Sequence, residues 1–168
     1  MKSTAIQKLL LADEVWLVVA RMHQCYPDRE SFAAADIVSE VRKANLFGQF
    51  RAGVVPHVHL HLIANMAPNP AAYRMLFKLA NGDLRLYRPG DPTHPDRRGK
   101  TMPDRDRLPA IYHHDLDWYE QVYCSGRAAT VPPPARSFID RLSGLGKLMW
   151  SDTSADDYVL EQRKGWDQ

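Results

Sequence analysis

The sequence predicts an α+β fold: a winged helix-turn-helix of three helices and a β-hairpin wing, followed by an extra C-terminal helix and an extended partner-binding tail. Two segments with helical periodicity precede a histidine-rich run that begins at Pro56. Two runs of alternating character follow, joined by Asn81-Gly82. This dipeptide is typical of a hairpin turn because both residues tolerate positive φ. The order of three helices and a hairpin is that of a winged helix.

Composition places the chain among ordinary soluble proteins. Of its 168 residues, 45% are hydrophobic and 25% charged, and the net charge of +2 is too small to identify a nucleic-acid partner. No apolar run reaches the ~20 residues of a membrane span, and the N-terminus lacks the layout of a signal peptide. Cys25 and Cys124 have no metal-ligand spacing. We expect a cytoplasmic protein with no membrane partner and no cofactor or bound metal.

The first two helices are predicted over residues 6–24 and 33–45. In each, apolar residues recur at three- and four-residue intervals and so share one face. Pro27 and Asp28 end the first helix, and Asn45 and Gly48 end the second. The apolar positions are Leu11, Val15, Val18, Val19 and Met22 in the first helix and Ala34, Ile37, Val38 and Val41 in the second.

The run His57–Met66 fits two structures. As a helix, it has Pro56 in its first turn, where a missing N–H costs little, and His57, His61 and Asn65 lie on one face. As a strand, it places His57, His59 and His61 on one side. We favour the helix, because Asn65 and Met66 continue the helical pattern and a winged helix needs a third helix.

The predicted wing spans residues 73–79 and 84–88. Arg74 and Lys78 lie on one side of the first strand, and Arg85 and Arg88 lie near the returning strand. A Pro/Gly/charged loop over residues 89–108 follows. Between Arg85 and Arg107 seven bases face four acids, so we expect a basic surface beside the wing. A further helix over residues 109–123 is expected to pack on the winged helix.

Three parts are expected along the chain. Residues 1–124 form the winged-helix domain with its basic loop 89–108. Residues 125–134 contain three consecutive prolines and are expected to form a semi-rigid linker. Residues 135–168 form a helical tail. Its last nineteen residues hold five acids, two bases and three aromatic residues. A segment of this size is too small to bury three aromatic rings by itself. We therefore expect it to fold back or to dock on a partner.

Two resemblances follow from particular motifs. The motifs PNPAAYRMLF, LYRPGDPTHP and LDWYEQVY resemble those of uncharacterised bacterial proteins whose first domain is winged-helix-like, over residues 8–124. The tail GKLMWSDTSADDYVLEQRKGWDQ resembles the C-terminal segments of type II antitoxins, the VapB-like ones that neutralise PIN-domain ribonucleases. VapB-like proteins usually carry a smaller DNA-binding domain. The resemblance implies toxin contacts at Trp150, Asp152, Tyr158, Arg163, Lys164 and Trp166.

The leading hypothesis is a homodimeric DNA-binding antitoxin that represses its own promoter and neutralises a toxin through its tail. The first alternative is a metal-dependent hydrolase that uses His57, His59 and His61. The second is a winged-helix module that binds protein and not DNA. No nucleophile elbow, phosphate-binding loop or dinucleotide fingerprint favours an enzyme. Operator DNA would be contacted by His57, His61, Asn65, Arg74, Lys78, Arg85 and Arg88.

Overall fold

The computed structural model describes residues 9–126. The chain divides into two units, residues 1–130 and 131–168, and the first contains every described residue. The predicted tail over residues 135–168 and most of the predicted linker therefore lie outside the described residues.

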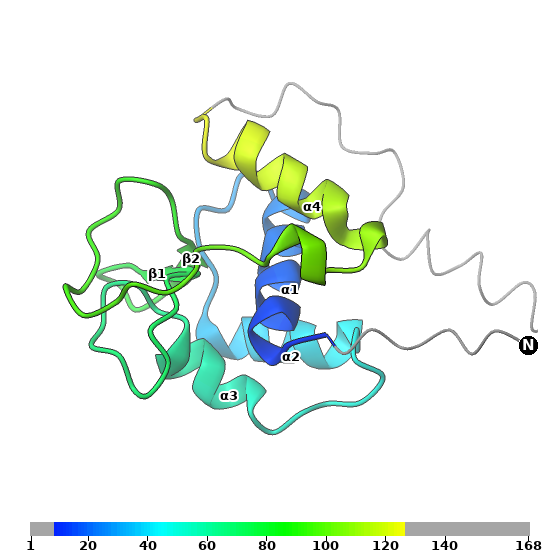
Figure 1. Cartoon of the computed structure of the whole chain (residues 1–168), viewed down its shortest axis with the longest axis horizontal. Helices are drawn as coiled ribbons and strands as arrows, with labels where there is room; N and C mark the ends of the chain where they lie inside the picture. Colours follow the sequence, from blue (N-terminus) through cyan, green and yellow to red (C-terminus); the bar gives the residue numbers. More distant parts are fainter. Residues whose placement is uncertain (1–8, 127–168) are drawn as a thin grey trace, which may run out of the picture. The chain divides into compact units, whose positions relative to one another are not determined.

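The described part is α+β, as predicted, with four helical regions and one antiparallel hairpin (Figure 1). This arrangement is compatible with a winged helix. The two predicted N-terminal helices and the hairpin are present, with shorter bounds than the periodicity indicated. The elements are α1 (Leu11–Cys25), α2 (Ala34–Ala44), α3 (Val54–Pro56), the π-helix η1 (His57–His61), β1 (Leu76–Lys78), β2 (Leu84–Leu86), the 3-10 helices η2 (Arg105–Arg107) and η3 (Ala110–Tyr112), α4 (His113–Trp118) and the π-helix η4 (Tyr119–Tyr123).

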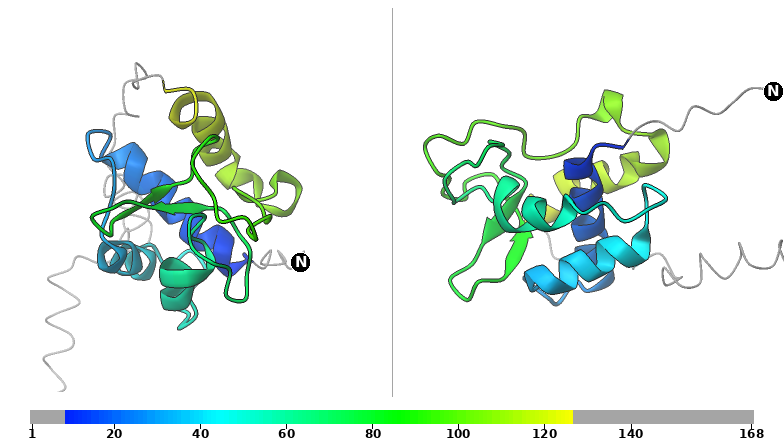
Figure 2. Two further views of the ribbon diagram at one scale, coloured as in Figure 1. Left: turned by 90° about the vertical axis from the view of Figure 1, so that its left-hand side faces the viewer. Right: turned by 90° about the horizontal axis from the view of Figure 1, so that it is seen from below.

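Helix α1 is the centre of the unit. Nine consecutive residues, 12–20, are buried, so the helix is enclosed on all sides and not on a single face. Helices α2 and α3 lie on one side of α1, and α4 lies on the opposite side (Figures 1 and 2). The first turn of α1 contains two buried carboxylates, and both have cationic partners. Asp13 pairs with Lys100, and Glu14 pairs with Arg51. Full enclosure explains why α1 carries so few exposed polar side chains.

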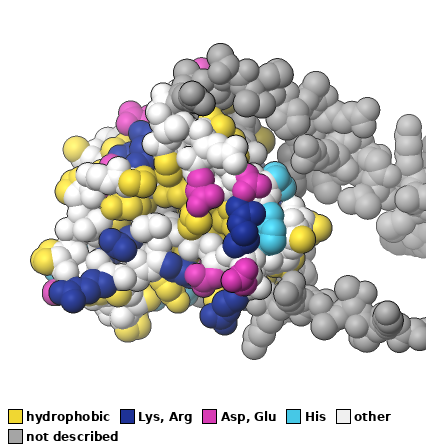
Figure 3. Space-filling view, turned by 45° about the horizontal axis from the view of Figure 1, so that its top comes forward, with side chains coloured by type: hydrophobic (Ala, Val, Ile, Leu, Met, Phe, Trp, Pro, Cys, Tyr) yellow, Lys and Arg dark blue, Asp and Glu magenta, His cyan; other side chains and the backbone are white. Residues whose placement is uncertain are grey.

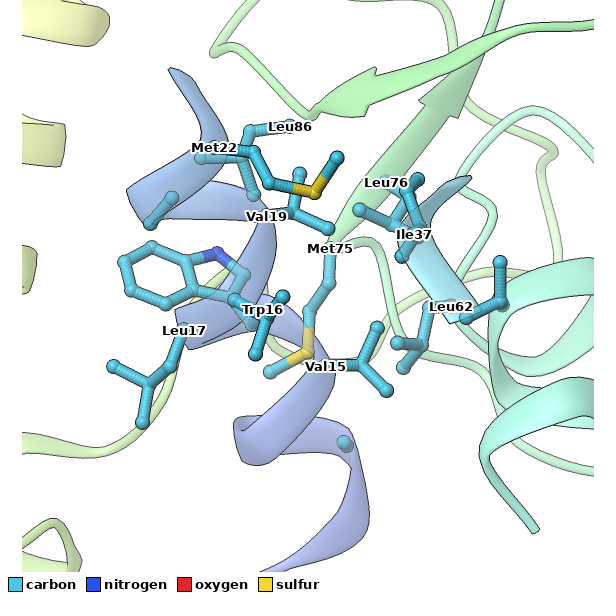
Figure 4. Packing of buried hydrophobic residues seen from close by; sticks show 14 of the residues in the cluster. Val15, Trp16, Leu17, Val19, Met22, Ile37, Leu62, Met75, Leu76 and Leu86 are labelled. Carbon is cyan, nitrogen blue, oxygen red and sulfur yellow. The ribbon is translucent and has the colours of Figure 1, made fainter. Parts of the chain in front are cut away.

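The core fills the space between α1, α2 and the hairpin. Trp16 is fully buried in the middle of α1, and Ile37 of α2 and Met75 before β1 meet the same cluster (Figure 4). Leu62, which follows η1, closes the cluster from the side of the third helix. Each of the elements expected of a winged helix thus contributes apolar side chains to one continuous core.

The hairpin pairs Leu76 with Leu86 and Lys78 with Leu84. Gly82 has a φ of 92°, which only glycine adopts without strain, so the predicted Asn-Gly turn is where the chain reverses. Both edges of the hairpin have a further neighbour. Phe32 makes an antiparallel bridge to Leu84, and Ile63 makes a parallel bridge to Leu76. The loop between α1 and α2 is thereby tied to β2 through Phe32.

Helices α4 and η4 dock on α1 and on the hairpin through polar contacts. The Asp115 side chain is fully buried and accepts hydrogen bonds from Arg21 and Gln24 of α1. The Tyr119 hydroxyl donates to the Tyr87 carbonyl at 2.6 Å, and the Tyr123 hydroxyl donates to the Leu86 carbonyl at 3.0 Å. The prediction that the segment over 109–123 packs on the preceding helices is therefore confirmed.

The long loops are held by Arg97. Its side chain is buried at 2% exposure. The five N–H groups of its guanidinium donate to six backbone carbonyl oxygens, and one N–H of Nη1 is shared between two of them. No carboxylate accepts a hydrogen bond from it among the described residues, so the carbonyl dipoles alone compensate its charge. The acceptors are the carbonyls of Met66, His61, Ala71, Tyr73, Leu60 and Ala67.

Candidate nucleic-acid interface

The third helical segment runs from Val54 through η1 to His61. The Leu62 N–H donates to the His57 carbonyl at 3.1 Å, the i to i+5 bond of a π-turn. Of the two structures that fit His57–His61, the helix is therefore the one adopted. Its predicted extension to Met66 is wrong. After His61 the chain leaves the helix in turns, and Ile63 forms a parallel bridge to Leu76. Met75 and Leu76 both donate backbone hydrogen bonds to the Leu62 carbonyl, which ties this segment to β1.

The three histidines of this helix do not converge. The His57 and His61 rings are in edge-to-face contact with centroids 4.9 Å apart, whereas His59 lies two positions from each and is exposed. The described residues contain no group of three or more His, Cys, Asp or Glu side chains that could hold a metal ion. The His57/His59/His61 hydrolase site therefore has no geometric basis in residues 9–126.

Asn65, predicted as a DNA contact, is bound to the hairpin. Its carboxamide donates to the Lys78 carbonyl at 2.8 Å and accepts from the Lys78 N–H at 3.0 Å. The side chain thus replaces a backbone peptide unit at the outer edge of β1. A carboxamide with both functions occupied is not free to read a base edge.

Replacing Asn65 with alanine is expected to lower the free energy of unfolding by about 1–2 kcal/mol, because two hydrogen bonds to the backbone are lost. Urea unfolding measures this effect. The Asn81→Ala variant, which loses side-chain hydrogen bonds in the exposed turn, is the matched control and should change less. Unchanged stability of Asn65→Ala would show that the carboxamide does not hold the β1 edge.

Arg85 is also committed inside the protein. The residue is 6% exposed. Its guanidinium forms a bidentate ion pair with the Asp91 carboxylate, with both N–O distances 2.7 Å. Asp91 also accepts the Arg88 backbone N–H, which closes the turn that follows β2. The guanidinium lies 4.7 Å from the centroid of the Phe77 ring. Arg85 therefore stabilises the base of the hairpin and does not face solvent, contrary to its predicted role.

The other basic residues predicted to contact DNA differ in how far their charged groups are exposed to solvent. Arg74 is half-buried, and its Nε donates to the Gly99 carbonyl at 2.9 Å. Arg88 is half-buried over the Tyr123 ring, 4.5 Å from its centroid. Lys78 is exposed and has no ion-pair partner among the described residues. Among the predicted wing residues, Lys78 presents its charge most freely.

The loop over residues 89–108 does not form the expected basic surface. Arg97 is buried, Lys100 pairs with Asp13 and Asp104, and Arg105 pairs with Asp117. Arg98 and Arg107 remain exposed without an ion pair in the described part of the chain. Residues 9–126 hold fourteen Lys and Arg and fourteen Asp and Glu, so the formal charges cancel. Figure 3 shows cationic and anionic side chains side by side on one face.

The sequence did not reveal that the third helix exposes apolar side chains. Val55 and Leu60 are 43% and 39% exposed, beside the exposed His59. Neither side chain was assigned to a face by the sequence analysis. Leu60 lies two positions beyond the buried Val58, about 200° further around a helix, and therefore on the outer side.

Comparisons with known proteins identify no relative: no family model, no curated protein and no solved structure matches the chain. None of the helices in residues 9–126 has the length and apolar character needed to cross a membrane. The predicted toxin contacts Trp150, Asp152, Tyr158, Arg163, Lys164 and Trp166 lie outside the described residues.

Proposed function

We propose that the chain is a winged-helix DNA-binding protein, acting as a homodimeric antitoxin that represses its own promoter. The segment Val54–His61 would enter the major groove, and the hairpin would lie over the adjoining phosphate backbone. The tail would neutralise a toxin, a PIN-domain ribonuclease in the VapB-like case, through the six tail residues named above. In such a tail, aromatic side chains fill pockets on the partner and the basic pair meets carboxylates of the nuclease.

The observation that carries the DNA-binding proposal is the order and packing of the elements. Helices α1, α2 and α3–η1 are followed by the hairpin, and the Phe32–Leu84 bridge adds an extended residue beside β2, an order compatible with a winged helix. In this arrangement the third helix keeps His59 exposed, and β1 keeps Lys78 exposed. An imidazole and an ammonium group are both suited to phosphate and base-edge contacts.

The proposed contact set differs from the predicted one at four residues, two removed and two added. It keeps His57 and His61 on the helix, Lys78 on β1 and the half-buried Arg74 and Arg88. Asn65 and Arg85 are left out because their polar groups are bound within the protein. His59 and Arg98 are added because both are exposed.

One observation favours a second function, a winged helix that binds protein. Exposed Val55 and Leu60 offer apolar area on the third helix, and the described part of the chain has no net charge. Since non-specific DNA affinity comes largely from phosphate neutralisation, a neutral domain gains little of it. Any DNA binding must therefore come from a few local contacts.

Replacing Lys78 with glutamine is expected to weaken DNA binding on every sequence and to lower the slope of log affinity against log salt by about 1. The Lys78 backbone keeps its hydrogen bonds to Asn65, so the hairpin is retained. Fluorescence anisotropy of labelled upstream DNA and random DNA over a salt series measures both quantities.

The matched control is Arg105→Gln, which makes the same charge change. Arg105 pairs with Asp117 of α4, and α4 lies on the opposite side of α1 from α3 (Figure 1). The control should leave the salt slope unchanged. Equal losses in the two variants would indicate an effect of total charge and remove the wing from the interface. No binding to either DNA at low salt would contradict the DNA-binding proposal and favour the protein-binding module.

A further inference from the structure

Two imidazole rings of the helix α3–η1, those of His57 and His61, lie in contact with each other. The proposed role of this helix in DNA binding does not require that contact. His57 and His61 are four residues apart, a spacing that places side chains on one face of a helix, one turn apart. Their ring centroids are 4.9 Å apart and their planes are inclined by 82°. They lie at the two ends of a π-turn, a rare conformation that occurs frequently at functional sites.

From this geometry we infer that His57 and His61 form a two-histidine site for a divalent transition-metal ion, such as Cu²⁺, Ni²⁺ or Zn²⁺. The inference does not rest on DNA binding. Imidazole nitrogen is a ligand that these ions favour. The site differs from the three-histidine site predicted for a hydrolase, because His59 is not part of it.

The tautomer of His57 is suited to metal binding. Its Nδ1 lies 2.8 Å from the Gly53 carbonyl oxygen, which can only accept, so Nδ1 carries the proton and Nε2 keeps its lone pair. Histidine ligands in metal sites usually donate their second ring N–H to a carbonyl or carboxylate in this manner. Burial lowers the pKa of His57 below its ordinary value, which favours the neutral imidazole that a metal ion requires.

His61 is positioned by its backbone, and its ring is not committed elsewhere. The His61 carbonyl accepts a hydrogen bond from Arg97 Nη1 at 2.8 Å, which fixes the end of η1. The buried Nδ1 atom of the His61 ring has no hydrogen-bond partner within residues 9–126. An imidazole without a protein partner can turn toward a shared ion at little cost in lost hydrogen bonds.

The charges around the pair allow a cation to bind. The nearby Arg51 guanidinium contributes to the lowered pKa of His57. The Arg51 guanidinium is itself bound to the buried Glu14 carboxylate and to the Leu9 carbonyl. The Glu14 carboxylate therefore compensates much of the Arg51 charge.

Two protein ligands make an open and exchangeable site. A structural zinc site has four protein ligands, and no third ligand converges on this pair within the described part of the chain. Water would complete the coordination. Affinity should follow the general order of divalent ions and be highest for Cu²⁺.

The test is a titration of the full-length chain, free of any histidine tag and treated with chelator, with Cu²⁺ alone, followed by calorimetry. His57→Gln and His61→Gln are each expected to weaken the affinity by about tenfold or more, since even partners of metal ligands contribute 10- to 100-fold. His59→Gln is the control within the same helix, and its affinity should stay within about twofold of the unchanged chain.

A second measurement does not depend on variants or on folding differences. In the unchanged chain, substoichiometric Cu²⁺ should broaden the imidazole NMR signals of His57 and His61 before those of the histidines outside this helix, His23, His94, His113 and His114. Loss of affinity in His59→Gln equal to that in His57→Gln would overturn the two-histidine site. So would first broadening at a histidine outside this helix. Because no DNA is present, failure here leaves the DNA-binding proposal untouched.

Discussion

Replacing Arg97 with alanine is expected to lower the free energy of unfolding by about 3–5 kcal/mol, enough to unfold a marginally stable domain. The guanidinium donates to six carbonyl oxygens, and the alanine variant leaves all six without this donor. A hydrogen bond to a charged group contributes about 1.5–3 kcal/mol, and the contributions do not add fully. Urea unfolding of the full-length variant measures the loss.

Arg98→Ala is the matched control, one residue along the same loop. Arg98 is exposed, so its removal should change the free energy of unfolding by less than about 0.5 kcal/mol. Arg97→Lys should recover only part of the stability, because an ammonium group has three donors and lacks the planar geometry of a guanidinium. Equal midpoints for Arg97→Ala and Arg98→Ala would refute the role assigned to this side chain.

Acidification from pH 7 to pH 5 is expected to lower the free energy of unfolding by about 2 kcal/mol through His23 alone. The His23 ring lies between Phe32 and Tyr123, with centroids 4.9 Å from each. Burial, with the neighbouring Arg88 and Arg85 guanidinium groups, lowers the pKa of His23 from 6.5 to about 4. Its Nε2 accepts the Leu86 N–H at 3.4 Å, which also requires the unprotonated nitrogen.

The sign follows from which state takes up the proton first. Between pH 6.5 and about pH 4 the unfolded chain protonates His23 and the folded chain does not, so stability falls as the pH falls through this window. Above pH 6.5 the contribution is fully present. Asp13 acts in the opposite direction, because burial raises the pKa of its carboxyl group and protonation relieves that cost.

The variant His23→Gln isolates this contribution, since glutamine keeps an acceptor for the Leu86 N–H and does not titrate. Its unfolding free energy, measured in urea from pH 8 to pH 5, should lack the part of the slope due to His23. His59→Gln removes an exposed imidazole and should keep the slope. If His23→Gln retains the full pH dependence, the buried histidine is not the titrating group.

The elements were largely predictable because local patterns determine them. Apolar spacing located α1 and α2, and Asn81-Gly82 located the turn of the hairpin. The end of the third helix was not predictable in this way. Residues 62–65 have a helical apolar pattern, but long-range pairing with β1 overrides that local preference.

The candidate site was predicted less well because the partners of charged side chains are remote in the sequence. Arg97, counted as part of a basic loop, binds carbonyls 24 to 37 residues away. Arg85 was predicted as a DNA contact because of its charge beside the returning strand, whereas all three residues of β2 are buried. Its position in the sequence does not show that α1 and η4 contact β2 and cover it.

The bridges at both sides of the hairpin leave no open strand edge. Phe32 exchanges two backbone hydrogen bonds with Leu84, and on the other side Ile63 and the Asn65 carboxamide occupy the groups of β1. Exposed edges are where sheets from different molecules join. The described unit is therefore protected against edge-to-edge aggregation, and a partner cannot be recruited here by adding a strand. Any protein that binds this unit must instead meet its helices or loops.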